Sequence, residues 1–124
     1  DYRHVHPSSQ TEEEGARIMN DILKEEDPPT AIFCANDCTA LGVLRSLNKC
    51  RRKNYLPSVI AIDNIRKSAK TSPMLTTIDI PKQELAHFAL LLLLDQQKKA
   101  HKECVRIELP CRLIERESCT YAPC

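Results

Sequence analysis

Glycine is scarce in this sequence, and its scarcity restricts the chemistry that the chain can perform. Only Gly15 and Gly42 occur among the 124 residues. Phosphate-binding loops need several closely spaced glycines, which let backbone amides approach the phosphate. A P-loop or a GxGxxG dinucleotide loop is therefore hard to build from this chain. The sequence also contains no GxSxG and no HExxH motif, so these signatures of hydrolases and zinc proteases are missing.

A marked charge excess and a long apolar run are also missing. The 18 Lys and Arg residues nearly balance 17 Asp and Glu residues, which gives a net charge of +1. This balance provides no basic surface for direct binding of nucleic acid or an anionic membrane. The longest apolar run, residues 88–94, is far shorter than the roughly 20 residues of a membrane span. The polar N-terminus does not resemble a signal peptide, and without an initiator Met we expect a piece of a longer protein.

Cysteine is abundant by comparison. The seven cysteines occupy positions 34, 38, 50, 104, 111, 119 and 124, and none of them forms a CxxC pair. A secreted disulfide framework would favour an even number in a loop-rich chain. Cys34 and Cys38 instead lie in apolar periodic segments, where a thiol behaves as a small hydrophobic group. We therefore expect reduced, mostly buried thiols and a cytoplasmic location.

Strand-like and helix-like patterns alternate along the chain. We expect strands at residues 31–35, 58–62 and 74–79, a loop or short helix at 65–72, and two short strands at 104–109 and 111–116. We expect helices from a cap at Ser9 or Thr11 to a stop at Pro28, from Cys38 to Lys49, and over residues 81–99. The continuous apolar run at 31–35 is typical of a strand buried on both faces of a parallel sheet. The alternation predicts an α/β fold, with a parallel sheet flanked by helices.

Two of the expected strands are followed by the same pair of residue types. Asn36 and Asp37 follow the strand at 31–35, and Asp63 and Asn64 follow the strand at 58–62. In open parallel sheets, ligands bind beyond the carboxyl ends of the strands. Amide and carboxylate groups held there suit a polyol, a sugar or a nucleobase, which needs fixed hydrogen-bond partners.

Each of these residues also has a purely structural interpretation. Asp37 directly precedes a helix, so we favour it as the helix N-cap. Asn36 could bond to neighbouring backbone, but its position at a strand end favours a ligand contact. Asp63 either contacts a ligand or forms a turn, and Asn64 is expected to be a loop residue. The sequence thus predicts Asn36 and Asp63 as ligand-binding residues, with Asp37 as a helix cap beside them.

Metal and catalytic sites have little support in the sequence. His4 and His6 could join a cysteine around a metal ion, but no second ligand pair with zinc-like spacing follows them. Cys50 beside Arg51 and Arg52 is the one candidate for a thiol activated by cationic neighbours. We therefore expect no catalytic residue, no metal and no cofactor, and an enzyme is the least supported class.

Taken together, the motifs resemble those of a known family. The stretches "PTAIFCANDCTALGVLRSL", "PSVIAIDNI", "SPMLTTIDIPKQELA" and "LIERESC" follow one another along residues 12–120. In this order and spacing they resemble the C-terminal half of the effector-binding domain of the lactose-repressor/galactose-repressor family. Members of that family are bacterial transcription regulators whose effector domain controls a separate DNA-binding head.

The resemblance implies a fold and a site. Residues 1–124 would form one lobe, the C-terminal part, of a periplasmic-binding-protein-like type I fold. Asn36 matches the family's strand-end asparagine that bonds to the effector, and Asp63 matches the aspartate that binds sugar hydroxyls or a nucleobase. Asp37 matches the aspartate that begins the following helix. The helix at 81–99 would pack on a missing N-terminal lobe, and the DNA-binding head is absent.

The chain departs from the family pattern in several places. Ala61 and Asn64 stand where the family has a glycine and an aspartate around its "GFDD" motif, and Met74 replaces a proline. The aromatic residue that usually stacks on the effector before the first helix is missing, and the chain has no tryptophan. Without the missing lobe, the leucines of residues 81–99 would be exposed, so we expect the chain to associate with itself or with a neighbour.

The leading hypothesis is the ligand-sensing domain of a bacterial transcription regulator. It would bind a sugar-like or nucleobase effector, act on DNA only through a missing N-terminal domain, and form a homodimer. The alternative is the periplasmic sugar-binding component of a transporter, which shares the architecture. The terminal "RES" element argues against that alternative, as do the many cysteines, which an oxidising periplasm would tend to pair.

Overall fold

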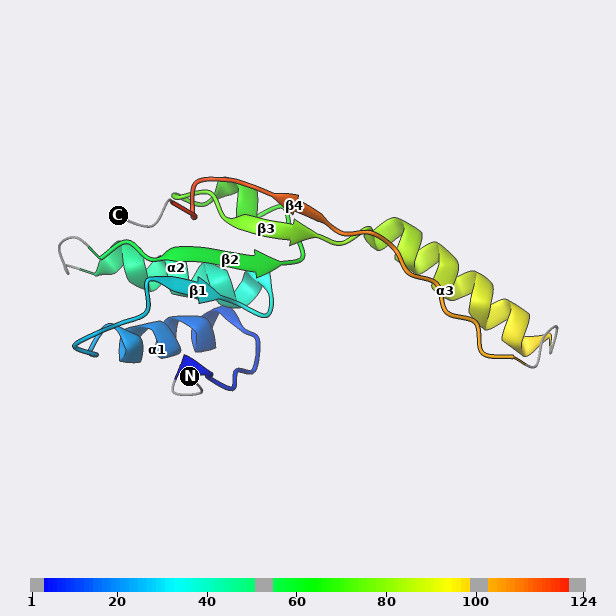
Figure 1. Ribbon diagram of the computed structural model, residues 1–124, viewed down its shortest axis with the longest axis horizontal. Helices are drawn as coiled ribbons and strands as arrows, with labels where there is room; N and C mark the ends of the chain where they lie inside the picture. The colour runs from blue at the N-terminus through cyan, green and yellow to red at the C-terminus, as the bar shows by residue number, and fades with distance from the viewer. Residues whose placement is uncertain (1–3, 51–54, 99–102, 121–124) are drawn as a thin grey trace. The chain divides into compact units, whose positions relative to one another are not determined.

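The structure is a computed structural model that describes residues 4–50, 55–98 and 103–120. Its elements are, in order, α1 (Glu12–Ile22), β1 (Ala31–Phe33), α2 (Asp37–Lys49), β2 (Ser58–Ile62), the short 3-10 helix η2 (Ser68–Lys70), β3 (Thr76–Asp79), α3 (Lys82–Gln97) and β4 (Arg112–Ile114) (Figure 1). The chain divides into two compact units. The first consists of residues 1–79 and 113–124, and the second of residues 80–112.

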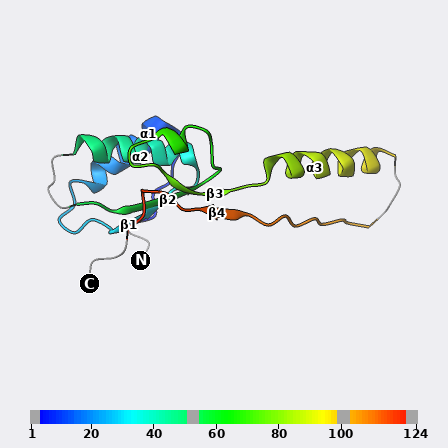
Figure 2. The same ribbon diagram turned by 90° about the horizontal axis from the view of Figure 1, so that it is seen from above.

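Four strands form one sheet in the order β1-β2-β3-β4, with β1 parallel to β2 and β2 parallel to β3. The chain after β4 runs antiparallel to β3, because the amide of Arg116 bonds to Thr76 Oγ1 and the amide of Ser118 bonds to the carbonyl of Met74. Helices α1 and α2 lie on the same side of the sheet (Figure 2). The predicted α/β fold with a parallel sheet and flanking helices is confirmed.

The core of the first unit lies between these two helices and the sheet. Met19 of α1, Val59 of β2 and Leu75 before β3 are all 0% exposed. Val43 and Leu44 of α2 complete the same cluster. The apolar face that the sequence predicted for α2 therefore points into the core, and burial of this face is the main force that holds the helix on the sheet.

Both glycines mark the place where α1 and α2 cross. A Cβ atom on Gly42 would lie 1.9 Å from the carbonyl oxygen of Glu12, and a Cβ atom on Gly15 would lie 2.1 Å from that of Thr39. Real side chains do not approach backbone this closely, so any larger residue would push the helices apart. The scarce glycines thus serve helix packing and not a phosphate-binding loop.

Helix α1 begins after Thr11, one of the two predicted caps, but it ends earlier than predicted. It stops at Ile22, and the amides of residues 24 and 25 bond to carbonyls three residues back. The predicted stop at Pro28 is therefore wrong. Residues 25–27 are all acidic, and negative charge is unfavourable at the negative end of the helix dipole.

Strand β1 is an edge strand and is less buried than predicted. Phe33 is 63% exposed, and Ala31 is exposed as well. Ile32 is half-buried and packs against the core, and the following residue, Cys34, is buried in it. The expectation of a strand buried on both faces is wrong for the described residues, because α1 and α2, the two long helices of the first unit, lie on the same side of the sheet (Figure 2).

In the second unit, α3 follows Pro81 and matches the helix predicted at residues 81–99. None of its described residues is buried. Leu85, Leu90, Leu91, Leu93 and Leu94 are all exposed, and leucines spread around a helix are typical of one that packs on more than one side. Their burial against another lobe or another copy stays a prediction. No helix among the described residues is long and apolar enough to cross a membrane.

Two further expectations are wrong. Residues 104–109 do not form a strand, because a strand needs a hydrogen-bonded neighbour and this segment has none among the described residues. The cysteines are not mostly buried: of the six described, all of them free thiols, only Cys34 is buried, and Cys50 is intermediate. The other four, Cys38, Cys104, Cys111 and Cys119, are exposed.

Candidate functional site

The carboxyl ends of β1 and β2 form the candidate site. Phe33 lies opposite Ile60 in the parallel pair, so the residues that follow the two strands reach the same edge of the sheet. They are also linked directly, since the amide of Ile65 donates to Asp37 Oδ2 over 2.9 Å. The structure thus brings together the two segments that the sequence singled out. A ligand contact by Asn36 or Asp63 stays a prediction.

Asn36 caps α2. Its backbone is extended, with φ −151° and ψ 166°, and its Oδ1 accepts a hydrogen bond of 2.8 Å from the amide of Thr39. Its Nδ2 donates to the carbonyl of Gln10 over 3.1 Å, which fastens the segment before α1 to the site. One amide proton and one oxygen lone pair of Asn36 are not used by these two bonds.

The prediction that Asp37 caps the helix is wrong, since Asp37 is already the first residue of α2. Asn and Asp are about equally good N-caps, so the sequence could not decide which of two adjacent residues takes the role. The backbone decided it, because an N-cap must be extended while the next residue is helical.

Asp37 instead forms the centre of a buried polar cluster. Its side chain is 0% exposed. Its Oδ2 accepts hydrogen bonds from Ser68 Oγ, at 2.6 Å, and from the amide of Ile65, while its Oδ1 accepts one from Thr77 Oγ1 at 2.5 Å. A buried carboxylate is tolerated only when such donors replace water, and the N-terminus of α2 adds a favourable dipole. The roles of Ser68 and Thr77 were missed by the sequence analysis, because they lie 31 and 40 residues from Asp37.

The turn after β2 has an unusual backbone. Asp63 has φ 121° and Asn64 has φ 50°, values that residues other than glycine rarely adopt. Three successive amides hold the turn: that of Asp63 bonds to the carbonyl of Ile78 at 2.9 Å, that of Asn64 to Thr77 Oγ1 at 3.3 Å, and that of Ile65 to Asp37. Such conformations cost about 1–3 kcal/mol each and persist where the surroundings impose them, often at functional sites.

The side chain of Asn64 bonds to two charged side chains. Its Nδ2 donates to Asp79 Oδ1 over 3.0 Å, and its Oδ1 accepts from Arg116 Nη2 over 2.7 Å. Arg116 Nη1 donates in addition to the carbonyl of Leu75 over 2.7 Å. Asn64 is therefore more than the loop residue that the sequence predicted. Arg116 was not singled out as a site residue, although it lies in the "LIERESC" motif.

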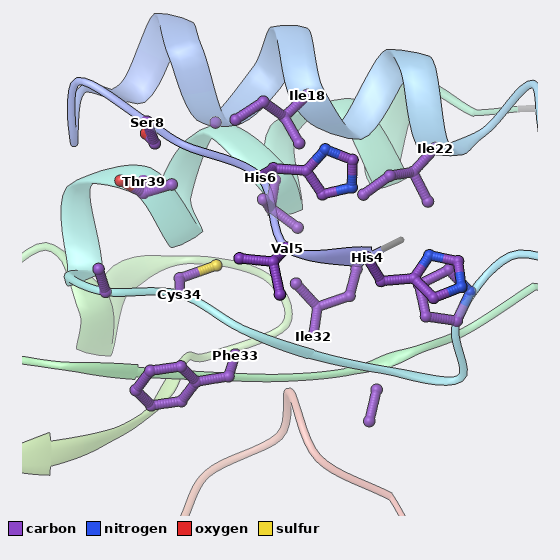
Figure 3. A pocket seen from close by; sticks show the side chains of 15 residues that line it. His4, Val5, His6, Ser8, Ile18, Ile22, Ile32, Phe33, Cys34 and Thr39 are labelled. Carbon is purple, nitrogen blue, oxygen red and sulfur yellow. The ribbon is translucent and has the colours of Figure 1, made fainter. Parts of the chain in front are cut away.

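A cavity of about 400 Å³ lies elsewhere, beside the edge strand β1 (Figure 3). Its walls are mostly apolar and come from the N-terminal segment, α1, β1 and α2; they include Val5, Ile18, Ile22, Ile32 and Val43. Neither Asn36 nor Asp63 lines it. We therefore do not assign the cavity to a polar ligand, which needs several fixed polar partners.

Cys34 lines this cavity, but the nucleophilic reactivity of its thiol is low. Burial raises the pKa of its thiol to about 12, and the negative charge of Asp37 adds to the effect. The thiol is therefore neutral near pH 7 and unsuited to nucleophilic attack. The described residues also contain no group of three or more His, Cys, Asp or Glu side chains that could hold a metal ion.

Comparison with known proteins places these features in context. Residues 1–119 match the family described as periplasmic binding protein-like domain. The chain is 38% identical, over 112 residues, to the HTH-type transcriptional repressor PurR of Photorhabdus laumondii. That alignment covers 90% of this chain and 33% of the repressor. The chain therefore spans about one third of the length of the curated relatives that it matches.

Solved structures of the same kind share the fold. A putative transcriptional regulator LacI from Bacillus cereus subsp. cytotoxis superposes with a TM-score of 0.80 at 29% identity, covering 89% of this chain and 39% of the other. A LacI family transcriptional regulator from Enterococcus faecalis, solved with bound ribose, gives a TM-score of 0.77 at 34% identity, covering 90% and 41%.

Proposed function

The chain belongs to the family of periplasmic binding protein-like domains, and from this premise we propose that it senses a small effector for a bacterial transcription regulator. The observation that carries the proposal is the strained turn at Asp63, held beside the Asn36 cap at the carboxyl edge of a parallel sheet. The similarity to proteins named as transcriptional repressors supports the same class. The periplasmic transporter component is not favoured.

The effector class follows from the side chains at this edge. The carboxylate of Asp63 would accept hydrogen bonds from two neighbouring hydroxyls, and the amide of Asn36 would use its remaining donor and acceptor positions. Hydroxyl pairs of this kind occur on sugars, and the edge of a nucleobase offers a comparable set of hydrogen-bond donors and acceptors. Solved relatives with bound ribose and lactose support a sugar as the first class to test.

The remaining parts of the proposal concern the whole protein. Effector binding would favour one arrangement of the complete domain and thereby change the affinity of a separate DNA-binding domain, a coupling that requires different affinities for the two states. We also propose a cytoplasmic homodimer. Binding and release of an effector break no covalent bond, so the proposal includes no enzymatic step.

The test uses the natural polypeptide that contains this chain. Isothermal titration with ribose, sucrose, lactose, cellobiose and hypoxanthine is expected to find one ligand with a dissociation constant in the micromolar range. Asp63→Ala should weaken that binding at least tenfold, because a hydrogen bond to a charged group contributes about 1.5–3 kcal/mol.

Asp27→Ala provides the matched control, since Asp27 is an exposed carboxylate in the loop before β1. It should bind the same ligand as tightly as the parent protein. Equal binding by Asp63→Ala and the parent would refute the site, and binding to none of the five ligands would refute the proposed effector class.

A further inference from the structure

The amide of Asn64 bridges two charged residues from different parts of the first unit. On one side its Nδ2 donates to the carboxylate of Asp79, and on the other its Oδ1 accepts from the guanidinium of Arg116. Asn64 follows Asp63 directly and shares its positive-φ turn. Any movement of this turn therefore changes the geometry of both hydrogen bonds.

The two partners lie where the chain passes between the units. Asp79 is the last residue of the first unit before the chain continues into residues 80–112, and the chain re-enters the first unit at Leu113. Arg116 follows three residues later, and its own amide is bonded to Thr76 Oγ1 at 2.9 Å. One side chain is thus bonded to the strand that leaves the unit and to the segment that returns to it.

We propose that Asn64 is a positioning residue that couples the turn carrying Asp63 to the two chain segments, at Asp79 and Arg116, that connect the first unit to the second. This inference rests on the proposed function, in which Asp63 contacts the effector. A shift of the turn on effector binding is passed through one amide to both connecting segments at once. The direction in which these segments leave the unit is then sensitive to occupancy.

The chemistry of the bridge requires an amide. Asparagine offers a donor to the carboxylate of Asp79 and an acceptor to the guanidinium of Arg116. An aspartate at position 64 would keep the bond to Arg116 but place a second carboxylate against that of Asp79, where like charges repel. If Asp79 is changed to Asn at the same time, the new amide at position 79 donates to the carboxylate at position 64, and the hydrogen bond between the two residues forms again with its direction reversed.

The first test compares hydrogen exchange in the ligand-free full chain. In N64D, repulsion between the carboxylates at positions 64 and 79 should displace the turn, and Arg116 with it through the bond that is kept. The amides of Asp63 and Arg116 should therefore exchange about tenfold faster. The exchanged pair N64D/D79N should restore slow exchange to within about threefold of the parent. The amide of Cys34, bonded to the carbonyl of Ile60 at 2.9 Å, should be unchanged and so excludes global unfolding.

The control is Asn20→Asp, which adds the same charge at an exposed position of α1 and should leave all three amides unchanged. Should N64D fail to fold, the exchanged pair must still fold and show the parent's exchange pattern. Unchanged exchange at Arg116 in N64D, or no recovery in the exchanged pair, overturns the inference.

The second test measures coupling in the natural polypeptide with ribose as the probe. Ribose should slow exchange at Lys82 and Arg116 in the parent and in N64D/D79N, but not in N64D. Ribose that binds the parent with no change at either amide overturns the inference. Failure of ribose to bind the parent excludes ribose as the effector instead, and the ligand-free comparison still decides the role of Asn64.

Discussion

Replacement of Asp37 is expected to destabilise the entire first unit, because one carboxylate holds three donors from distant parts of the chain. The amide of Ile65 and the hydroxyls of Ser68 and Thr77 all bond to it. Asp37→Ala leaves these groups without their acceptor, at about 1–3 kcal/mol for each buried donor. Removal of a buried charge returns part of that cost. We expect the free energy of unfolding to fall by about 3–5 kcal/mol.

Asp37→Asn separates the loss of hydrogen bonds from the loss of volume. The amide has nearly the same shape, but its NH2 group faces donors that the carboxylate oxygens had bonded. The expected loss is about 1–3 kcal/mol, smaller than that of Asp37→Ala because one oxygen still accepts. Both values are large beside a total stability of about 5–15 kcal/mol for a typical domain.

The assay is urea unfolding of the full chain followed by circular dichroism, with the midpoint and slope both fitted. Asp27→Ala removes an exposed carboxylate and should stay within about 0.5 kcal/mol of the parent. A loss below about 1 kcal/mol for Asp37→Ala would refute the view that this cluster organises the unit. Equal losses in the two Asp37 variants would show that the altered hydrogen bonding accounts for the whole effect and that the lost volume adds nothing, because Asn keeps nearly the shape of Asp.

The helix crossing, the cysteines and α3 each lead to a further prediction. Gly42→Ala should lower the free energy of unfolding by about 2 kcal/mol or more in the same urea assay, because the added Cβ would meet the backbone of α1. Helix propensity alone predicts the opposite, a gain of about 1 kcal/mol. A more stable variant would therefore contradict the close helix crossing. Iodoacetamide at pH 8, followed by mass spectrometry, should label exposed Cys38 in the folded chain but Cys34 only after unfolding. Burial raises the pKa of Cys34 to about 12, so the folded state holds the thiol proton more tightly than the unfolded state, in which the pKa is about 8.5. The stability that comes from this difference is complete below the unfolded pKa and is lost as the pH rises towards 12. Leu90→Glu should shift the chain towards the monomer in sedimentation velocity at high concentration, and a parent chain that is already monomeric there would refute self-association through α3.

Several elements could be predicted from the sequence because their signals are local. Strand β2 covers the residues predicted for it, Ser58–Ile62, and α2 differs from its prediction by one residue at the start. Apolar periodicity, helix caps and proline act within a few residues, so they are legible in the sequence alone. The order of strands and helices then indicates a parallel sheet, which the structure confirms.

The division of roles between Asn36 and Asp37 depended on the tertiary structure. Both are good N-caps, and only the three-dimensional fold shows that Asp37 points instead at donors from η2, β3 and the turn after β2. Burial of β1 and pairing of residues 104–109 also depend on partners that a local pattern cannot contain. The sequence by itself determined the fold class and the two segments at the edge of the sheet, because those follow from neighbouring residues. The tertiary structure decided which side chains support the Asp63 turn, because those contacts join residues that are 13 to 52 positions apart.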